Sequence, residues 1–530
     1  MSEETLCQVC AKSARQKCAG CHLVFYCTKE HQKSDWKTHK KACKPYKVCQ
    51  DDTLGRYLEA TRDIKPNEIV LKEAPLIWGP AENTVPVCLG CGNTVDENCK
   101  PCFKCGWPFC SETCQKSPAH IPECRYTVMR GDKVAVKNFG IVHPIYQCIT
   151  VLRCLYQKQF LPEVWEKIDK LESHCEHRKN HPKYENDRVT IAQFILRFFK
   201  LGTVFTEEEI LRIVGILTVN GHEVPLSEPC YEAIYQTCSM FEHNCRPNCR
   251  KSFTDDGQIL ITSGQKISKG DHLTICYTDP LWGTSNRRHH LYQTKYFWCN
   301  CSRCKDVTEG GTNFSTMKCQ NECNGYILPK TFLDNEDGDK LQDWECNKCK
   351  KIMNSYSVHE ILERLGKDLS LIEKGSSKSC KEYISHAEDF LHSNHYYLTD
   401  AKINLSQLLG HEEKTLLPNL SEDDILLKAK LCRSLTNMIK KLVPGEHRLT
   451  GLLLFELHAA IAEIGRRGSP ESLPEALMES KNILMEAMGL LKFEPESLPE
   501  GKIYKQAQKN LIDIERVLKT VQTTFGDKLL

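Results

Sequence analysis

Four cysteines near the middle of the chain have the residue type and spacing of a zinc site. Three of them follow the pattern C-x-C-x2-C, which is one thiolate short of the four that a closed tetrahedral zinc site needs. A cysteine farther upstream is the natural fourth ligand. A zinc ion bound by all four would join the segment at Glu242 and His243 to the segment that follows Tyr277, and would shape a pocket between them. The predicted ligands are Cys245, Cys299, Cys301 and Cys304.

The whole chain is rich in cysteine, with 32 among its 530 residues. In a reducing compartment, cysteines in such patterns are metal ligands more often than disulfide partners. Of these cysteines, 21 are predicted ligands. Together with three histidines they fill about six tetrahedral zinc sites. Besides the set above, the predicted ligands are Cys7, Cys10, Cys18, Cys21, Cys27, His31, His39 and Cys43, then Cys88, Cys91, Cys102, Cys105, Cys110, Cys114, His120 and Cys124, and finally Cys319, Cys323, Cys346 and Cys349.

These cysteine-rich segments are too short to bury a core, so bound metal would supply most of their folding free energy. The set at 319–349 indicates a small zinc ribbon around an exposed acidic loop at 333–340, and a surface hairpin with free thiols is the alternative. Isolated cysteines among apolar neighbours, such as Cys148, are expected to be small buried hydrophobes.

Composition excludes several classes of function. Basic and acidic residues are nearly balanced, at 71 and 69, which argues against a general polyanion-binding surface and against DNA binding by the fingers. No apolar run approaches the length of a membrane span, and the acidic start is unlike a signal peptide. We therefore expect a protein of three or four domains that is not secreted and resides in the cytoplasm, the nucleus or both.

The elements that must position these residues are strands first and helices later. Apolar residues alternate on either side of the turn-forming residues 65–68, which predicts a β-hairpin. Between about residues 125 and 236 the pattern is helical, and a capping box at 206–209 begins a helix that ends at Asn220. From residue 355 onward, amphipathic stripes predict stacked helices; two stripes run through Val358, Ile361, Leu362, Leu365, Leu369 and Ile372, and through Ile425, Ala429, Cys432, Leu435, Ile439 and Leu442.

Three motifs occur in a fixed order around the first zinc set: EHNCRPNC at 242–249, LTICYTD at 273–279 and KYFWCNCSRC at 295–304. In this order they resemble the C-terminal half of a SET domain. The resemblance implies the fold of S-adenosylmethionine-dependent protein-lysine methyltransferases, in which the chain passes through its own loop as a pseudoknot beside the cofactor. It implies an α+β multidomain protein with a β-rich SET domain.

The patterns at 7–43 and 88–124 resemble MYND zinc fingers, whose ligand pairs interleave. By this resemblance Cys7, Cys10, Cys27 and His31 bind one zinc, and Cys18, Cys21, His39 and Cys43 bind another. A MYND module inserted in a split SET domain is typical of SET- and MYND-domain methyltransferases, and the extra N-terminal finger resembles their arthropod branch. The implied domains are a MYND finger at 1–46, a split SET domain at 47–298 with a second finger at 88–124, a post-SET zinc site and zinc ribbon at 299–350, and an all-α tetratricopeptide-like domain at 355–530.

The resemblance also implies roles inside the pocket. Tyr277 takes the position of the active-site tyrosine, which orients the amine of a lysine on a protein substrate. A narrow, desolvated channel favours the uncharged amine that methyl transfer requires. Proline-rich peptides are the implied partners of the MYND modules. The residues implied to bind S-adenosylmethionine are Arg56, Asn220, Glu242, His243 and Phe297.

The chain departs from the family pattern inside this pocket. Glu242 stands where the family has asparagine, and Lys295 stands where relatives often have a second tyrosine. The G-x-G motif also loses its second glycine, which is Tyr57 here. An ionised glutamate only accepts hydrogen bonds, whereas an asparagine also donates them. The alternative hypothesis is therefore a catalytically weak or inactive adaptor, a scaffold that binds partner proteins through its MYND modules.

Overall fold

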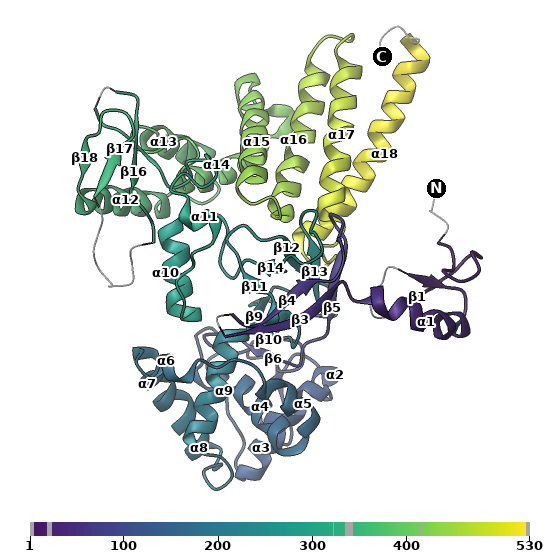
Figure 1. Ribbon diagram of the computed structural model, residues 1–530, viewed down its shortest axis with the longest axis vertical. Coiled ribbons are helices and arrows are strands. Elements are labelled where there is room, and N and C mark those ends of the chain that lie inside the picture. The colour runs from purple at the N-terminus through teal and green to yellow at the C-terminus, as the bar shows by residue number, and fades with distance from the viewer. Residues whose placement is uncertain are drawn as a thin grey trace.

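Short strands gather in the middle of the molecule and helices lie at both ends in the computed structural model (Figure 1). The structure describes residues 5–18, 24–52, 54–321, 323–333, 343–412 and 415–525. Helices between residues 121 and 220 form one end, and helices between residues 422 and 525 form the other. The N-terminal finger projects to one side of the strands.

Three small sheets build the middle of the molecule. Strands β3 (Tyr46–Asp51) and β4 (Gly55–Ala60) form an antiparallel hairpin. The second sheet has the order β12 (Cys249–Phe253), β13 (Ile259–Ser263) and β5 (Ile69–Glu73), and the third has the order β6 (Ile77–Pro80), β10 (Tyr231–Ile234) and β9 (His222–Val224). Leu58, Val70 and Ile261 belong to the apolar core that these strands share. The core therefore joins strands that lie far apart in the sequence.

The hairpin predicted around residues 65–68 is wrong in its pairing. The turn itself forms. The N–H of Glu68 donates to the carbonyl of Lys65 at 3.2 Å, and the Glu68 carboxylate accepts the N–H of Lys65 at 3.0 Å. However, β4 pairs with the preceding strand β3, and β5 pairs with β13, with Leu71 opposite Ile261. The partner of β5 lies far along the chain, beyond the reach of a local pattern.

A short parallel pair brings the sequence motifs together. Strand β11 (Glu242–His243) lies beside β14 (Thr274–Ile275), with His243 opposite Ile275. The side chain of Asn248 supports this pair: its Oδ1 accepts the N–H of Thr274 at 2.9 Å, and its Nδ2 donates to the carbonyl of His272 at 2.7 Å. The asparagine of the first motif therefore holds the strand that carries the second motif.

The helical end contains the segments α3 (Ile121–Arg130), α4 (Ile149–Phe160), α5 (Pro162–Asp169), α6 (Cys175–Arg178), α7 (Pro182–Asp187), α8 (Phe194–Phe198) and α9 (Glu207–Asn220). The predicted capping box is confirmed: the hydroxyl of Thr206 accepts the N–H of Glu209 at 3.2 Å, and the Glu209 carboxylate accepts the N–H of Thr206. Helix α9 ends at Asn220, as predicted. The strands β9 and β10 follow α9, so the helical region ends at residue 220 and not near residue 236.

The cysteine-rich segments fold as small strand and helix units. The N-terminal unit has β1 (Gln16–Lys17), β2 (Phe25–Tyr26) and α1 (Lys29–Cys43), and the unit inserted between β6 and α3 has β7 (Lys100–Pro101), β8 (Pro108–Phe109) and α2 (Glu112–Gln115). The predicted ribbon is a four-stranded antiparallel sheet of β15 (Met317–Lys318), β16 (Tyr326–Pro329), β17 (Trp344–Cys346) and β18 (Ile352–Met353). The acidic loop predicted at 333–340 lies outside the described residues except for Leu333.

The C-terminal part is helical, as the amphipathic stripes predicted. Its helices are α12 (Ser355–Ser370), α13 (Ser377–Ala387), α14 (Tyr396–Leu408), α15 (Glu422–Leu442), α16 (His447–Arg467), α17 (Leu473–Leu491) and α18 (Pro499–Phe525). All six residues of the second predicted stripe are buried in α15. Arg250 on β12 pairs with Glu494 at 3.3 Å, which joins this part to the central strands. Among the described helices, none has the length and apolar content needed to cross a membrane.

Candidate active site and metal centres

A cavity of about 940 Å³ lies between the helical end and the strands. Every residue predicted to act in catalysis or cofactor binding lines it, although they come from five separate segments. They are Arg56 on β4, Asn220 at the end of α9, Glu242 and His243 on β11, Tyr277 after β14, and Phe297 just after α10 (Thr284–Lys295). A volume of this size suits a small-molecule site.

Tyr277 is held by its backbone and by its hydroxyl. Its N–H donates to Nδ1 of His243 at 3.0 Å. Its hydroxyl donates to the carbonyl of Phe241. Burial raises the pKa of Tyr277, so the side chain stays a phenol. With its proton directed to Phe241, the oxygen is left to accept a hydrogen bond from a group in the cavity.

His243 connects Tyr277 to the predicted zinc ligands. While its Nδ1 accepts from Tyr277, its Nε2 lies 3.2 Å from Sγ of Cys245. Its ring also packs at a tilt against the ring of Phe297, with centroids 5.9 Å apart. The imidazole is therefore fixed on three sides. Because it contacts both Cys245 and Tyr277, the position of the tyrosine depends on the position of the cysteine cluster.

Glu242 does not stand alone in the cavity wall. Its carboxylate lies 2.6 Å from Nδ1 of His272, and the ring of His272 stacks on Tyr57 with centroids 4.4 Å apart. Burial raises the pKa of Glu242, and His272 opposes this rise. Two of the three departures from the family pattern, Glu242 and Tyr57, thus belong to one contact network that keeps the carboxylate in place.

Asn220 and Arg56 use part of their hydrogen-bonding capacity on the protein itself. Nδ2 of Asn220 donates to the carbonyls of Ile216 at 2.8 Å and Glu172 at 2.7 Å. Arg56 donates to the carbonyl of Lys170. Both side chains border the cavity. The Asn220 amide has both donors engaged, so it presents its oxygen as an acceptor.

Four lysines also line the cavity, Lys170, Lys183, Lys251 and Lys295. Nζ of Lys295 donates to the carbonyls of Val219 at 2.7 Å and Thr218 at 3.1 Å, and it lies 5.9 Å from the centroid of the Tyr277 ring. Lys251 lines the same cavity from β12. Sequence reasoning noted Lys295 as a replacement but missed Lys251. Lys251 could have been recognised from its place in the strand, because it is the exposed residue of an otherwise buried strand.

The cysteines predicted to form the central zinc site converge. Cys245, Cys299, Cys301 and Cys304 have their sulfurs within 4.8 Å of one another. The sulfur of Cys245 is 3.5 Å from that of Cys304, which follows it by 59 residues. Four thiolates at this separation fit tetrahedral zinc.

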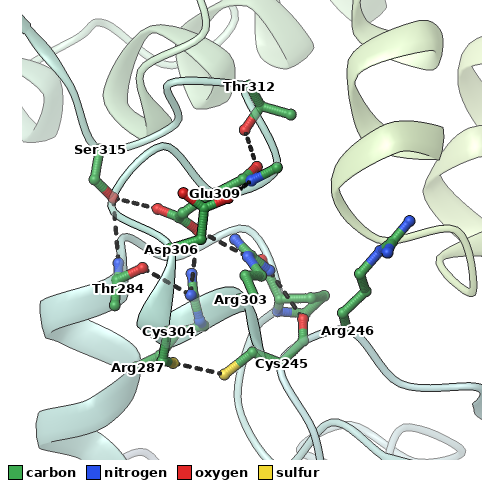
Figure 2. Close-up of polar contacts among 12 residues, drawn as sticks. Cys245, Arg246, Thr284, Arg287, Arg303, Cys304, Asp306, Glu309, Thr312 and Ser315 are labelled. Atoms are coloured by element: carbon green, nitrogen blue, oxygen red, sulfur yellow. Dashed lines mark hydrogen bonds and ion pairs between the residues drawn. The ribbon is translucent and has the colours of Figure 1, made fainter. Parts of the chain in front are cut away.

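A buried ionic network supports this cysteine cluster (Figure 2). Arg303 donates to the carbonyl of Cys245 at 3.0 Å and pairs through Nε with Glu309 at 2.7 Å. Glu309 also pairs with Arg287 at 3.2 Å and accepts the hydroxyl of Ser315 at 2.6 Å. Burial opposes ionisation of Glu309, but the two arginines lower its pKa. The network has one more positive than negative charge, which offsets the negative charge of a tetrathiolate site.

Four further groups of predicted ligands come together in the fingers and the ribbon, each with its ligand atoms within 4.8 Å. They are Cys7, Cys10, Cys27 and His31; Cys88, Cys91, Cys110 and Cys114; Cys102, Cys105, His120 and Cys124; and Cys319, Cys323, Cys346 and Cys349. For the remaining predicted set, the sulfurs of Cys18 and Cys43 are 3.5 Å apart, and Cys21 lies outside the described residues.

The inserted finger has a supporting carboxylate that sequence reasoning missed. Glu123 is fully buried and lies 3.2 Å from Nδ1 of His120, while Nε2 of His120 faces Cys105 at 3.4 Å. Glu123 also pairs with the buried Arg153 of α4 at 3.0 Å. A carboxylate on the far nitrogen fixes the orientation of a metal-binding histidine. The same carboxylate fastens the finger to the helical end.

Comparison with known proteins identifies the modules. Family models for the MYND finger and the SET domain match residues 7–43 and 55–278. The chain is thus a SET-domain protein with a MYND finger. Both modules were predicted from the motif order, and relatives named SmydA-8 and Smyd1 are similar to the chain.

Several relatives share most of the chain. "SET domain-containing protein SmydA-8, isoform A" of Drosophila melanogaster is 27% identical over 383 residues, which cover 69% of this chain and 79% of the relative. "Histone-lysine N-methyltransferase ASHR1" of Arabidopsis thaliana is 25% identical and covers 76% and 83%. A solved SET domain of LSMT, described as bound to lysine and AdoHcy, matches at 13% identity with a TM-score of 0.23 over 93% of this chain and 96% of that one.

Proposed function

We propose that this protein is an S-adenosylmethionine-dependent protein-lysine N-methyltransferase. The observation that carries the proposal is the position of Tyr277, which lines the cavity while His243 and Phe241 hold its N–H and its hydroxyl. The relatives named histone-lysine N-methyltransferases support the same reaction class. The acceptor is a lysine on a protein, and its identity is left to substrate screening.

The cavity walls fit a methyl donor that carries an ammonium group and an aromatic base. Glu242 supplies a carboxylate and Asn220 an amide oxygen, both acceptors suited to an ammonium. Arg56 can pair with a carboxylate, and Phe297 and His243 offer a ring surface for the base. When bound, the donor supplies an electrophilic methyl group on a sulfonium. The protein's part is to hold the substrate amine on the Tyr277 oxygen, uncharged and in line.

We propose zinc ligand roles for the six predicted sets, including the one with Cys21. The SET fold then serves as the catalytic module, and the two MYND-type fingers bind proline-rich segments of partner proteins. Exposed aromatic side chains support that role, since Trp36 of the first finger is 41% exposed and Phe103 of the second is 70% exposed. We propose that the protein acts in the cytoplasm, the nucleus or both.

Calorimetric titration with S-adenosylmethionine tests the enzymatic proposal. We expect wild-type protein to bind the donor at micromolar concentration, and Tyr277→Phe to bind it equally while losing about a hundredfold in methyl transfer to a histone mixture. Glu242→Asn is the matched variant for the adaptor hypothesis. If the wild type releases no heat and Glu242→Asn binds the donor, the adaptor hypothesis replaces ours.

A further inference from the structure

Lys295 places an amine inside the cavity that we assign to methyl transfer. It is the last residue of α10, and its side chain reaches across to the last turn of α9. Nζ is fixed there by the carbonyls of Thr218 and Val219, and it lies over the ring of Tyr277. An exposed surface lysine has no such fixed position, whereas this amine is held inside the cavity beside Tyr277.

The hydrogen bonds of Lys295 suit a neutral amine. A neutral amine has two N–H bonds and one lone pair, whereas an ammonium has three N–H bonds and no lone pair. Two carbonyls accept from Nζ, so the loss of the third proton breaks neither hydrogen bond and frees a lone pair inside the cavity. The site therefore accommodates the nucleophilic form of lysine without rearrangement.

The surroundings of Lys295 also favour the uncharged form. Burial lowers the pKa of Lys295 to about 8, with a further contribution from Lys251 and an opposing one from Glu232. At about pH 7.5 roughly a quarter of such amines is uncharged, compared with about one in a thousand for an ordinary lysine. The uncharged amine is the reactive species in methyl transfer.

We infer that Lys295 is a self-methylation site, the acceptor of one methyl group from S-adenosylmethionine in the protein's own cavity. The inference rests on the proposed function. In the reaction the Nζ lone pair forms a bond to the methyl carbon, and the bond from that carbon to sulfur breaks. The products are N-methyllysine and S-adenosylhomocysteine, and one proton passes to solvent. Monomethyllysine keeps two N–H bonds when protonated, enough for both carbonyls, whereas dimethyllysine keeps only one; a single methyl group is therefore the expected product.

The test uses full-length, zinc-loaded protein and donor with a deuterated methyl group. Peptide mass spectrometry should find the mass of one labelled methyl group on Lys295, at a rate independent of protein concentration. Lys295→Arg keeps the charge and the donors, and should abolish the label. Lys378→Arg on α13, where the lysine side chain is 86% exposed, is the control outside the cavity and should retain it.

A second readout needs no donor. Acetic anhydride labelling across a pH series should modify Lys295 with a midpoint near 8, well below the value of about 10.4 for a lysine in a model peptide. A midpoint for Lys295 near that model value would overturn the inference.

The two proposals can fail separately. If histones gain label and Lys295 does not, Lys295 only caps helix α9, and the inference is overturned while the proposed function stands. If calorimetry detects no donor binding and no acceptor gains label, the proposed function fails and the inference fails with it.

Discussion

The ionic network behind the central cysteine cluster gives a sharp prediction for Glu309→Gln. Glu309 is fully buried and faces two guanidinium groups, Arg287 at 3.2 Å and Arg303 at 2.7 Å, whose side chains are 0% and 2% exposed. Glutamine keeps the shape but removes the only carboxylate that these contacts supply to the two arginines. Breaking a buried ion pair from one side costs about 3–5 kcal/mol. Because glutamine still accepts one hydrogen bond, we expect about 3 kcal/mol.

This loss should be local, so it is best measured by hydrogen exchange. Amides between residues 284 and 315 should lose about 3 kcal/mol of protection. In competition with a chelator, the affinity of the central site for zinc should fall roughly ten- to a hundredfold. Glu363→Gln in α12 is the control, since its side chain is 77% exposed and the change should stay within about 0.5 kcal/mol. Protection in Glu309→Gln within 1 kcal/mol of wild type, on the order of the control, would refute the role of the network.

Three further predictions concern the cavity, the helical end and the C-terminal helices. His272→Ala removes the group that opposes the raised pKa of Glu242, so calorimetric donor binding should begin to weaken at a higher pH than in wild type; an unshifted pH profile would count against the pair. Thr206→Ala removes the capping box of α9 and should cost about 1 kcal/mol, seen as a lower midpoint in thermal melting, whereas the conservative Thr206→Ser should keep most of it. Burial lowers the pKa of His395 to about 3 and that of His447 to about 4, from an ordinary 6.5. The unfolded chain therefore binds more protons below pH 6.5, so the stability of the C-terminal helices should fall from there to about pH 4 by about 1.4 kcal/mol per pH unit for each histidine. Circular dichroism melts across that range check the slope, and a flat profile would contradict it.

The features that sequence reasoning predicted correctly are those decided within a few residues. Chelating pairs such as Cys102 and Cys105 are three residues apart in the sequence, so their spacing alone brings the two sulfurs close enough to bind one metal ion. The capping box at Thr206 and the stripe through α15 depend on helical periodicity alone. The convergence of Cys245 on Cys304 is long-range, but the count of thiolates required it.

The features that were wrong or missed depend on partners far apart in the chain. The pairing of β5 with β13 joins residues separated by almost the whole SET domain, and a turn signal cannot report it. The supporting groups Glu123 and Glu309 carry no motif, because a carboxylate is recognised as buried only once its neighbours are placed. The sequence marked Lys295 as a departure, but its carbonyl partners became visible only in the fold.

The central cysteine cluster and the proposed active site are connected through His243, so a displacement of one would move the other. Cys245 contributes its sulfur to the cluster and its carbonyl to Arg303, and the His243 ring lies against that sulfur while it accepts the N–H of Tyr277. A shift of β11 would therefore move the tyrosine oxygen together with Glu242, for which we propose a role in cofactor binding. Catalytic positioning tolerates displacements of well under an ångström. This requirement explains why the cluster is backed by a buried ionic network, when a short loop between two strands would otherwise be free to move.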